Sequence, residues 1–401
     1  MKKILILILS ITLIFTCSGC GLIFRDPTES TAPSTSGDSD TLPPETIPQG
    51  AQQLSMVSIS LPLVQTFESA DDGTLLISCT YQQVFTPILQ DADVAEAVAL
   101  DLMNRIDSIN TAAGNLSDQA KSDYAGQSGW DPYFSQVYYN PMRLDASVLS
   151  LYGQTVTFAG GIHPDYTGVS VTYDLVNGNV LLLGDLLTDT CTPEKLADLV
   201  VEALNDPDND FYLYSDFAET VAARFGNGWE QDSGWYLSPE GLCFYFSPYD
   251  IGPYATGTVV ASVPYEKLAG LLEDAYFPVE RLDGDGTVEA TLFEDAELDS
   301  YSQFSEAILN PDGVRFLLHT QGTVYDLRLE QGQWSDDGTL FMPDCTVFAA
   351  SSLTPGDAVM VQAMFPDVLS PLRLTYRSGE EDVSVYLSQS GKDGTIILEK
   401  A

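Results

Sequence analysis

The sequence predicts an α+β fold followed by an all-β, sandwich-like domain at the C-terminal end. Between residues 51 and 276, strand-like runs and helical periodicity alternate irregularly and are joined by hairpin turns, which favours an α+β arrangement over a doubly wound parallel sheet. From residue 277 to 401, short alternating runs such as VRFLLHT and VSVYLS are separated by Asp-Gly and Pro-Gly turns, at the spacing typical of a β-sandwich. A chain of 401 residues is long enough for two or three hydrophobic cores.

The N-terminal residues predict a lipid anchor. Lys2 and Lys3 precede an apolar run of twelve residues, Ile4 to Phe15, which is too short to span a bilayer. Cys17-Ser18-Gly19-Cys20 then places small residues directly before a cysteine. This pattern resembles a bacterial lipobox, which implies a signal peptide over residues 1–19 and lipidation of Cys20. An uncleaved signal anchor is the alternative, and either one predicts an extracytoplasmic protein held at the cell membrane.

Residues 20–50 predict a tether. After Phe24 they consist almost entirely of Ser, Thr, Pro, Asp, Glu and Gly, which cannot bury a core. A flexible coil of this length has an end-to-end distance of roughly 30 Å. It would hold a folded head away from the lipid surface.

The first folded segment, residues 51–144, opens with strand-like alternation and continues into a helix. The runs SMVSISLPLV and LLISCTYQQVF alternate apolar and polar residues. A helix is predicted from Asp91 to Ile109, with Asp91 as its N-cap. Apolar residues recur every three or four positions along it: Ala95, Val98, Leu102, Ile106 and Ile109. One face of this helix is expected to pack on the strands.

The second segment, residues 145–276, combines hairpins with short helices. Asn177-Gly178 lies between two apolar runs and predicts a hairpin turn, since both central positions of that turn need a positive φ. The tetrapeptide from Ser238 to Gly241 predicts a second turn between strands. Helices are predicted after the Thr192 cap and Pro193, around Asp216 to Phe225, and after Pro264.

The third segment, residues 277–401, is expected to contain little besides strands. Its one candidate for a helical turn runs from Tyr301 to Leu309. Asp283-Gly284-Asp285-Gly286 invites comparison with a calcium loop, but it lacks the further acidic positions of an EF-hand. A plain β-turn is therefore the preferred interpretation.

The composition is strongly acidic, with 58 Asp and Glu against 16 Lys and Arg and a net charge of −42. Loss of Lys2 and Lys3 with a signal peptide leaves 14 basic residues, and the net charge is then near −44. Such a field excludes nucleic acid and anionic membrane surfaces as partners, and it attracts cationic ones. Solubility alone is an alternative explanation of the charge.

The remaining cysteines and the histidines indicate no catalytic or metal-binding site. Cys79, Cys191, Cys243 and Cys345 are spread over the three segments, and buried free thiols are favoured over disulfides because cores of this size need no cross-links. The two histidines, His163 and His319, lie in no metal-binding or nucleophile motif. We expect no catalytic residue, no metal and no cofactor, and hence a binding protein and not an enzyme.

Three strings in the middle of the chain carry a family resemblance. They are GGIHPDY (Gly160 to Tyr166), TYDLVNGNVLLLGDLL (Thr172 to Leu187) and FSPYDIGPYATG (Phe246 to Gly257). In this order they resemble the extracytoplasmic domain of the lysozyme-sensing anti-sigma factors of the RsiV type. That family has long been catalogued as a domain of unknown function and is also found beside the PdaC peptidoglycan deacetylases. The resemblance reaches back to about Leu54 and leaves residues 277–401 outside.

The resemblance implies that this segment binds lysozyme by presenting loops to its substrate cleft. On this sequence the matching positions are Gly160, Gly161, His163 and Pro164 in one loop and Pro248, Tyr249, Pro253 and Tyr254 in another. Rigid Tyr and Pro side chains lose little entropy on binding, and lysozymes are strongly basic, so an acidic protein suits this role. The alternative is that the tyrosines pack on their own sheet.

One departure from the family concerns regulation. The anti-sigma factors carry a sigma-binding region and a spanning helix before this module, whereas here a signal peptide occupies that place. Direct control of a sigma factor is therefore not expected.

A second hypothesis is a non-catalytic module that binds peptidoglycan. Aromatic side chains stack on sugars, and the candidates are Trp130, Tyr138, Tyr139 and Trp229. A third is a structural lipoprotein in which the all-β domain carries out recognition.

Overall fold

The computed structural model describes residues 56–126, 128–207, 209, 211–278, 284–293, 300–335, 340–365 and 371–400. All of them belong to one compact unit, Gln53–Ala401. The predicted signal peptide, Cys20 and the predicted tether lie outside the described residues. The fold is a mixed, largely β arrangement that contains four sheets.

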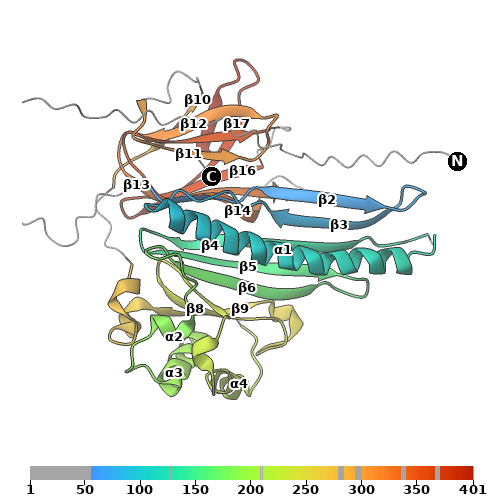
Figure 1. Ribbon diagram of the computed structural model, residues 1–401, viewed down its shortest axis with the longest axis vertical. Coiled ribbons are helices and arrows are strands. Elements are labelled where there is room, and N and C mark those ends of the chain that lie inside the picture. Colours follow the sequence, from blue (N-terminus) through green and yellow to red (C-terminus); the bar gives the residue numbers. More distant parts are fainter. Residues whose placement is uncertain are drawn as a thin grey trace, which may run out of the picture. The chain divides into compact units, whose positions relative to one another are not determined.

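A five-stranded sheet with one long helix forms the N-terminal part of this unit (Figure 1). β3 and β4 are parallel neighbours, and α1 is the crossover between them. Val94, Val98 and Leu102 of α1 are buried against Val137 and Leu149 of the sheet. The elements, with the strands in their order across the sheet, are β2 (Leu63–Ser69), β3 (Leu75–Gln82), β4 (Tyr133–Leu144), β5 (Val148–Phe158), β6 (Asp165–Asp174) and the helix α1 (Ala92–Asp123).

The next part combines a three-stranded antiparallel sheet with helices that share one core. Leu196 and Val200 of α3 and Phe244 of β8 are fully buried in this core. Its elements are α2 (Leu183–Leu186), α3 (Pro193–Leu204), α4 (Phe217–Arg224), η1 (Trp229–Gln231), β7 (Trp235–Leu237), β8 (Gly241–Phe246), η2 (Tyr254–Thr256), β9 (Val259–Pro264), η3 (Tyr265–Leu268) and η4 (Asp274–Tyr276).

The C-terminal part is a β-sandwich, as predicted. A six-stranded sheet, in the order β1-β14-β13-β16-β17-β18, faces a four-stranded sheet, in the order β10-β12-β15-β11, and both sheets supply one core. Its strands are β1 (Ser58–Ser60), β10 (Val288–Leu292), β11 (Gln303–Ile308), β12 (Val314–Thr320), β13 (Val324–Trp334), β14 (Phe341–Leu353), β15 (Asp357–Ala363), β16 (Leu372–Ser378), β17 (Glu381–Gln389) and β18 (Ile396–Lys400).

Both predicted helix caps are confirmed. Asp91 accepts hydrogen bonds from the backbone N–H groups of Asp93 and Val94, which have no partner inside the first turn of α1. Thr192 accepts one from Lys195, and Pro193 is the first residue of α3, where its missing N–H costs nothing.

Four local predictions were wrong or incomplete. The first helix continues to Asp123 and does not end at Ile109. The hairpin at Asn177-Gly178 is reduced to one bridge, between Tyr173 and Val180, and α2 follows it. Pro264 precedes only the 3₁₀ turn η3. The segment Tyr301 to Leu309 contains strand β11 in place of a helical turn.

The predicted segment boundaries do not coincide with the sheets. β1 lies in the first segment but pairs with β14, so that Ser58 is opposite Ala350 and Ser60 is opposite Phe348. The boundary between residues 144 and 145 separates β4 from β5, which are antiparallel neighbours in one sheet. Strand pairing therefore crosses the expected boundaries between 51–144, 145–276 and 277–401.

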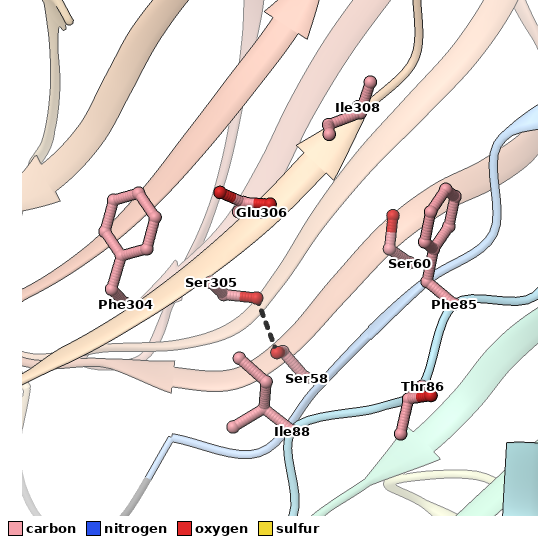
Figure 2. Close-up of a pocket in the computed structure, with 9 residues that line it drawn as sticks. All are labelled: Ser58, Ser60, Phe85, Thr86, Ile88, Phe304, Ser305, Glu306 and Ile308. Atoms are coloured by element: carbon pink, nitrogen blue, oxygen red, sulfur yellow. Dashed lines mark hydrogen bonds between the residues drawn. The ribbon is translucent and has the colours of Figure 1, made fainter. Parts of the chain in front are cut away.

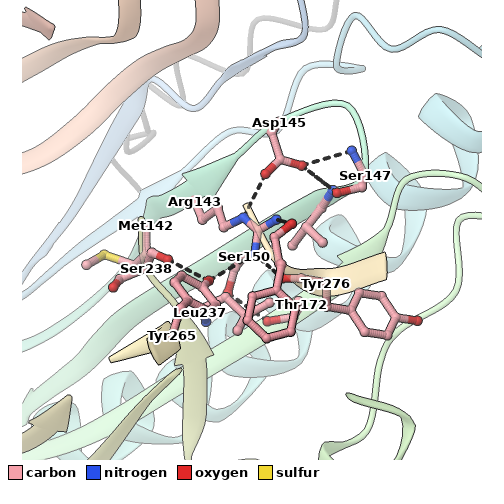
Figure 3. A network of polar contacts seen from close by, with 12 residues as sticks. Met142, Arg143, Asp145, Ser147, Ser150, Thr172, Leu237, Ser238, Tyr265 and Tyr276 are labelled. Carbon is pink, nitrogen blue, oxygen red and sulfur yellow. Dashed lines mark hydrogen bonds and ion pairs between the residues drawn. The ribbon is translucent and has the colours of Figure 1, made fainter. Parts of the chain in front are cut away.

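A buried arginine connects the five-stranded sheet to the part that follows it (Figure 3). The side chain of Arg143, at the end of β4, is 3% exposed, and its Nε lies 2.7 Å from Oδ2 of Asp145. Its Nη1 donates to the hydroxyl of Tyr265 and to the carbonyl of Tyr276, and its Nη2 donates to the carbonyl of Phe277. All three nitrogen atoms of the guanidinium therefore donate hydrogen bonds, as a charge in an apolar interior requires.

Candidate functional site

The two loops singled out in the sequence meet in the structure. We call residues 159–164, between β5 and β6, the hairpin loop, and residues 247–258, between β8 and β9, the tyrosine loop. The hydroxyl of Tyr254 donates a 2.9 Å hydrogen bond to the carbonyl oxygen of Pro164. The ring of His163 stacks on that of Tyr254, with 3.9 Å between the centroids. Residues ninety positions apart in the chain therefore form one surface.

Glycines shape the hairpin loop. β5 and β6 are paired up to Thr157 and Asp165, so the chain must reverse direction within a few residues. Gly160 and Gly161 have φ values of +82° and +110°, a region that other residues rarely adopt. A Cβ at Gly160 would also lie 3.3 Å from the hydroxyl of Tyr133. The positive φ values favour glycine at both positions, and close packing against Tyr133 is a second reason at Gly160.

The tyrosine loop is closed by short-range hydrogen bonds. The backbone N–H of Ser247 donates to the carboxylate of Asp250 at 2.7 Å, and that of Tyr249 donates to the carbonyl of Gly252 at 3.0 Å. Tyr249 is held at a φ of +76°, which costs a residue with a side chain about 1–2 kcal/mol. Left-handed residues other than glycine cluster at functional sites, where the surrounding structure maintains the strain.

The two loops expose large side chains together. Ile162 is 100% exposed, Tyr249 is 58% exposed and Tyr166, at the start of β6, is 36% exposed. Tyr254 is half-buried between them, with ring centroids 5.7 Å from Tyr249 and 6.1 Å from Tyr166. Tyr254 therefore joins the two loops, whereas Tyr249 and Ile162 face outward. Neither Ile162 nor Tyr166 was among the residues predicted for this site, although an apolar residue at a loop tip, Ile162 between Gly161 and His163, was the available signal.

A neighbouring segment extends the surface. The carbonyl oxygen of Tyr212 accepts a 2.9 Å hydrogen bond from the hydroxyl of Thr256, and Tyr214 donates its N–H to the carbonyl of Ile251. The side chain of Tyr212 is 75% exposed. These bonds fix the far end of the tyrosine loop and place another aromatic ring next to it.

The electrostatics of the site keep Tyr254 a hydrogen-bond donor. The pKa of Tyr254 is raised, first because neighbouring groups remove solvent from the phenol, and then because Tyr166, Tyr249 and Asp165 disfavour a phenolate. The hydroxyl therefore stays protonated at neutral pH and keeps its bond to Pro164. In the same region, the carboxylates of Asp165 and Asp250 belong to exposed residues, so the rim of the surface is acidic.

His163 lies at the junction of the two loops. Nδ1 of His163 lies 3.1 Å from the carbonyl oxygen of Pro164, and its ring is covered by Tyr254, so no nucleophile pairs with it among the described residues. Within the same residues, no group of three His, Cys, Asp or Glu side chains could hold a metal ion. Asp283 lies outside them.

The four cysteines predicted to be free thiols are free, as expected. Cys191, Cys243 and Cys345 are buried, and Cys79 is partly buried. Burial raises the pKa of the Cys345 thiol to about 12, with a smaller contribution from Asp344. These thiols are therefore protonated, and their side chains contribute to packing.

The aromatic residues proposed for sugar stacking are not arranged as an exposed platform. Tyr139 is 3% exposed in the core beneath α1, and Tyr138 and Trp229 pack against other cores. Trp130 stacks on Tyr133, with centroids 5.0 Å apart, and is partly buried. Tyr139 is buried and the other three are partly buried, and alternation along β4 turns Tyr139 toward α1 and Tyr138 toward the sandwich.

Comparison with known proteins identifies a domain within this chain. Residues 185–266 match the family described as "Protein of unknown function (DUF3298)". This DUF3298 segment runs from α2 to η3 and contains the whole tyrosine loop, but not the hairpin loop. No curated protein matches the chain.

Two solved structures from the DUF3298 family are similar to parts of the chain. One, from Bacteroides fragilis, has 18% identity and a TM-score of 0.37 over 56% of this chain and 95% of its own. Another, from Pseudomonas aeruginosa, has 15% identity and a TM-score of 0.38 over 57% of this chain and 99% of its own.

Proposed function

We propose that this chain is an extracytoplasmic binding protein that captures lysozyme through the hairpin and tyrosine loops. The observation that supports this most directly is the meeting of the two loops, which unites Ile162, Tyr249 and Tyr254 in one surface. The resemblance of these loops to the lysozyme-sensing proteins adds to it. The DUF3298 segment contains one of the two loops.

The physical properties of the surface suit a protein ligand with a cleft. Tyr254 and the left-handed turn at Tyr249 fix the loops in advance, so little conformational entropy is lost on binding. Exposed aromatic and aliphatic side chains on such a rigid support are typical anchors that fill pockets in a partner.

The negative charge of the chain is expected to raise the rate of association with lysozyme more than the affinity. The chain carries a net charge of −42, and lysozymes are strongly basic. Attraction between the two raises the rate of encounter and weakens as salt screens it over about 8–10 Å. We therefore expect added salt to slow association while dissociation changes little.

We also propose that the mature chain is held on the outer face of the cell membrane through a lipid on Cys20. Among the described residues, no helix is long and apolar enough to cross a bilayer. Metabolic labelling with palmitate should be lost in Cys20→Ala and retained in Cys17→Ala. The opposite pattern would show that the lipid site is misplaced.

A calorimetric titration with purified lysozyme tests the binding proposal. The protein would be residues 20–401 with Cys20→Ser, which removes the lipid site and which we call the soluble chain. Ile162→Ser should weaken binding at least about tenfold, because burying an exposed Ile contributes about 1.5–3 kcal/mol. The matched control is Leu100→Ser on α1, which is 58% exposed and distant in the chain from both loops.

Two results would contradict the proposal. One is equal lysozyme affinity in Ile162→Ser and in the unchanged chain. The other is binding of the soluble chain to purified peptidoglycan in the absence of any measurable binding to lysozyme.

A further inference from the structure

A second surface, unrelated to the two loops, lies at one edge of the C-terminal sandwich. A groove of about 440 Å³ separates β11 from β1 and the segment 85–88 (Figure 2). Its volume falls in the range of about 300–1,000 Å³ that is common for ligand sites. The residues that line it are Ser58, Ser60, Phe85, Thr86, Ile88, Phe304, Ser305, Glu306 and Ile308.

The groove runs along the free edge of β11. β11 is the last strand of its sheet and pairs only with β15. Side chains of successive strand residues point to opposite faces, yet Phe304, Ser305 and Glu306 all line the groove. Residues of both faces can contact one space only along the edge itself, where the backbone N–H and C=O groups face outward. The groove therefore gives access to an edge backbone that lacks a neighbouring strand among the described residues.

The opposite wall is already paired. Ser58 exchanges backbone hydrogen bonds with Ile88 at 3.0 and 2.9 Å, and Phe85 donates its N–H to the carbonyl of Ser60 at 3.2 Å. The outer edge of β1 is thus covered by the segment 85–88, so any additional backbone pairing in the groove must come from β11.

A buried hydroxyl inside the groove lacks a partner. Ser60 is 6% exposed, and its Oγ has no hydrogen bond within the described part of the chain. In Figure 2 this oxygen points into the space between Phe85 and β11. The neighbouring hydroxyls of Ser58 and Ser305, by contrast, bond each other at 2.8 Å. A buried polar group without a partner is uncommon in a folded protein, and it is satisfied when a ligand supplies a donor or an acceptor.

The walls define the chemistry of that ligand. Phe85 and Ile88 are 37% and 36% exposed and, with Phe304 and Ile308, offer apolar contacts to both sides of a chain. Glu306 is exposed and forms no ion pair with a described residue. A carboxylate beside apolar walls in a chain with a net charge of −42 selects a cationic group and repels acidic ones.

We propose that this groove binds an extended peptide, which adds a strand to the free edge of β11. The peptide carries a basic side chain that pairs with Glu306 and an apolar side chain that packs between Phe85 and Phe304. Its backbone bonds the edge of β11 and the hydroxyl of Ser60. Such strand addition combines affinity from backbone hydrogen bonds with selectivity from alternate side chains. From residue 304 to 308, β11 spans roughly 13 Å, so four to five peptide residues match it.

Fluorescence anisotropy with labelled peptides and the soluble chain tests this inference. The probe is a capped heptapeptide of alternating Val and Thr with one central Lys. One comparison peptide carries Glu in place of Lys, and another carries N-methyl groups on alternate backbone amides, which block strand pairing. We expect the Lys peptide to bind, the Glu peptide to bind about tenfold more weakly, and the methylated peptide not to bind.

Substitutions in the groove, with one control outside it, test whether the peptide binds there. Glu306→Lys should lower the affinity for the Lys peptide about tenfold and make the Glu peptide the better ligand. The matched control is Glu289→Lys, an exposed carboxylate on β10 at the opposite edge of the same sheet, which should change neither affinity. Thr86→Trp, at an exposed position, should obstruct the groove and abolish binding without disturbing the core.

Three results would overturn the inference. They are equal binding of the methylated peptide, full binding by Thr86→Trp, and absence of peptide binding together with a dimer of the chain in sedimentation that Thr86→Trp disrupts. The last would assign the edge to a second copy of the chain. Because Ile162 is not part of this groove, Ile162→Ser should leave peptide binding unchanged, so the failure of one proposal does not imply the failure of the other.

Discussion

Replacing Tyr249 by glycine should separate binding from stability. The side chain of Tyr249 is 58% exposed, and its backbone is held at a φ of +76°. If the ring is an anchor for lysozyme, its removal should cost at least about 2 kcal/mol of binding free energy, or roughly thirtyfold in affinity. If the ring instead supports its own loop, its removal should lower stability.

The expected change in stability is small because three contributions nearly cancel. Glycine at a left-handed position relieves about 1–2 kcal/mol of backbone strain. Its greater freedom in the unfolded chain removes about 0.5–1 kcal/mol, and the lost contact with the ring of Tyr254 removes about 0.5–1.5 kcal/mol. The free energy of unfolding of Tyr249→Gly should therefore stay within about 1 kcal/mol of the unchanged chain.

The assay combines urea denaturation with calorimetric titration against lysozyme on the same preparation. Phe67→Ala is the control, since Phe67 is an aromatic residue on β2 that is 65% exposed, and lysozyme affinity should not change in it. A large loss of stability with unchanged affinity in Tyr249→Gly would refute the reasoning.

Three further outcomes follow from buried and charged groups. Arg143→Met should lower the free energy of unfolding by about 3–5 kcal/mol, measured by urea denaturation, because it removes the donor shared by the carboxylate of Asp145 and the carbonyl oxygens of Tyr276 and Phe277; a change below about 1 kcal/mol would contradict this. Lys121→Met should cost less than about 1 kcal/mol at pH 7, because both partners are exposed. The Lys121 ammonium lowers the pKa of Glu68, so this cost should be present above the ordinary carboxyl pKa and be lost as the pH falls through the lowered pKa of Glu68, and a cost that grows in acid would argue against it. In native protein at pH 8, iodoacetamide should modify Cys79 before Cys345, because Cys345 is buried and its thiol has a pKa raised to about 12. Mass spectrometry measures the order of modification, and the reverse order would contradict the burial of Cys345.

Features that depend on neighbouring residues could be predicted from the sequence. The caps at Asp91 and Thr192 and the turn from Ser238 to Gly241 are determined by local chemistry, and the structure confirms all three. The position of the tyrosine loop followed from the prolines that exclude a central strand. The pairing of the two loops could not be derived this way, because the Tyr254–Pro164 hydrogen bond joins distant strands.

The errors arose where tertiary packing outweighed local signals. Beyond Ile109, the apolar face of α1 continues through the buried residues Ala113, Leu116 and Ala120, and small side chains made this pattern weak. Gly114 weakens the helical signal further, and no atom lies within 4 Å of where its Cβ would be, so packing does not require a glycine there. At Asn177-Gly178, Gly178 has the predicted positive φ, +76°, but Asn177 does not, and the chain beyond the turn forms one bridge only, between Tyr173 and Val180.

The pairing of β1 with β14 makes the first strand dependent on the last third of the chain. Val57, Ile59 and Leu61 are at most 2% exposed, and the backbone N–H of Val57 bonds the side chain of a residue 294 positions later. At typical synthesis rates of 5–20 residues per second, that partner emerges from the ribosome roughly 15–60 seconds after the strand does. Until then the backbone of β1 lacks its partner strand, although the side chains of Val57, Ile59 and Leu61 belong to the core formed with α1 and the five-stranded sheet. The sandwich is therefore completed only late in synthesis and folding. A chain that stops before residue 345 would leave β1 without its partner strand.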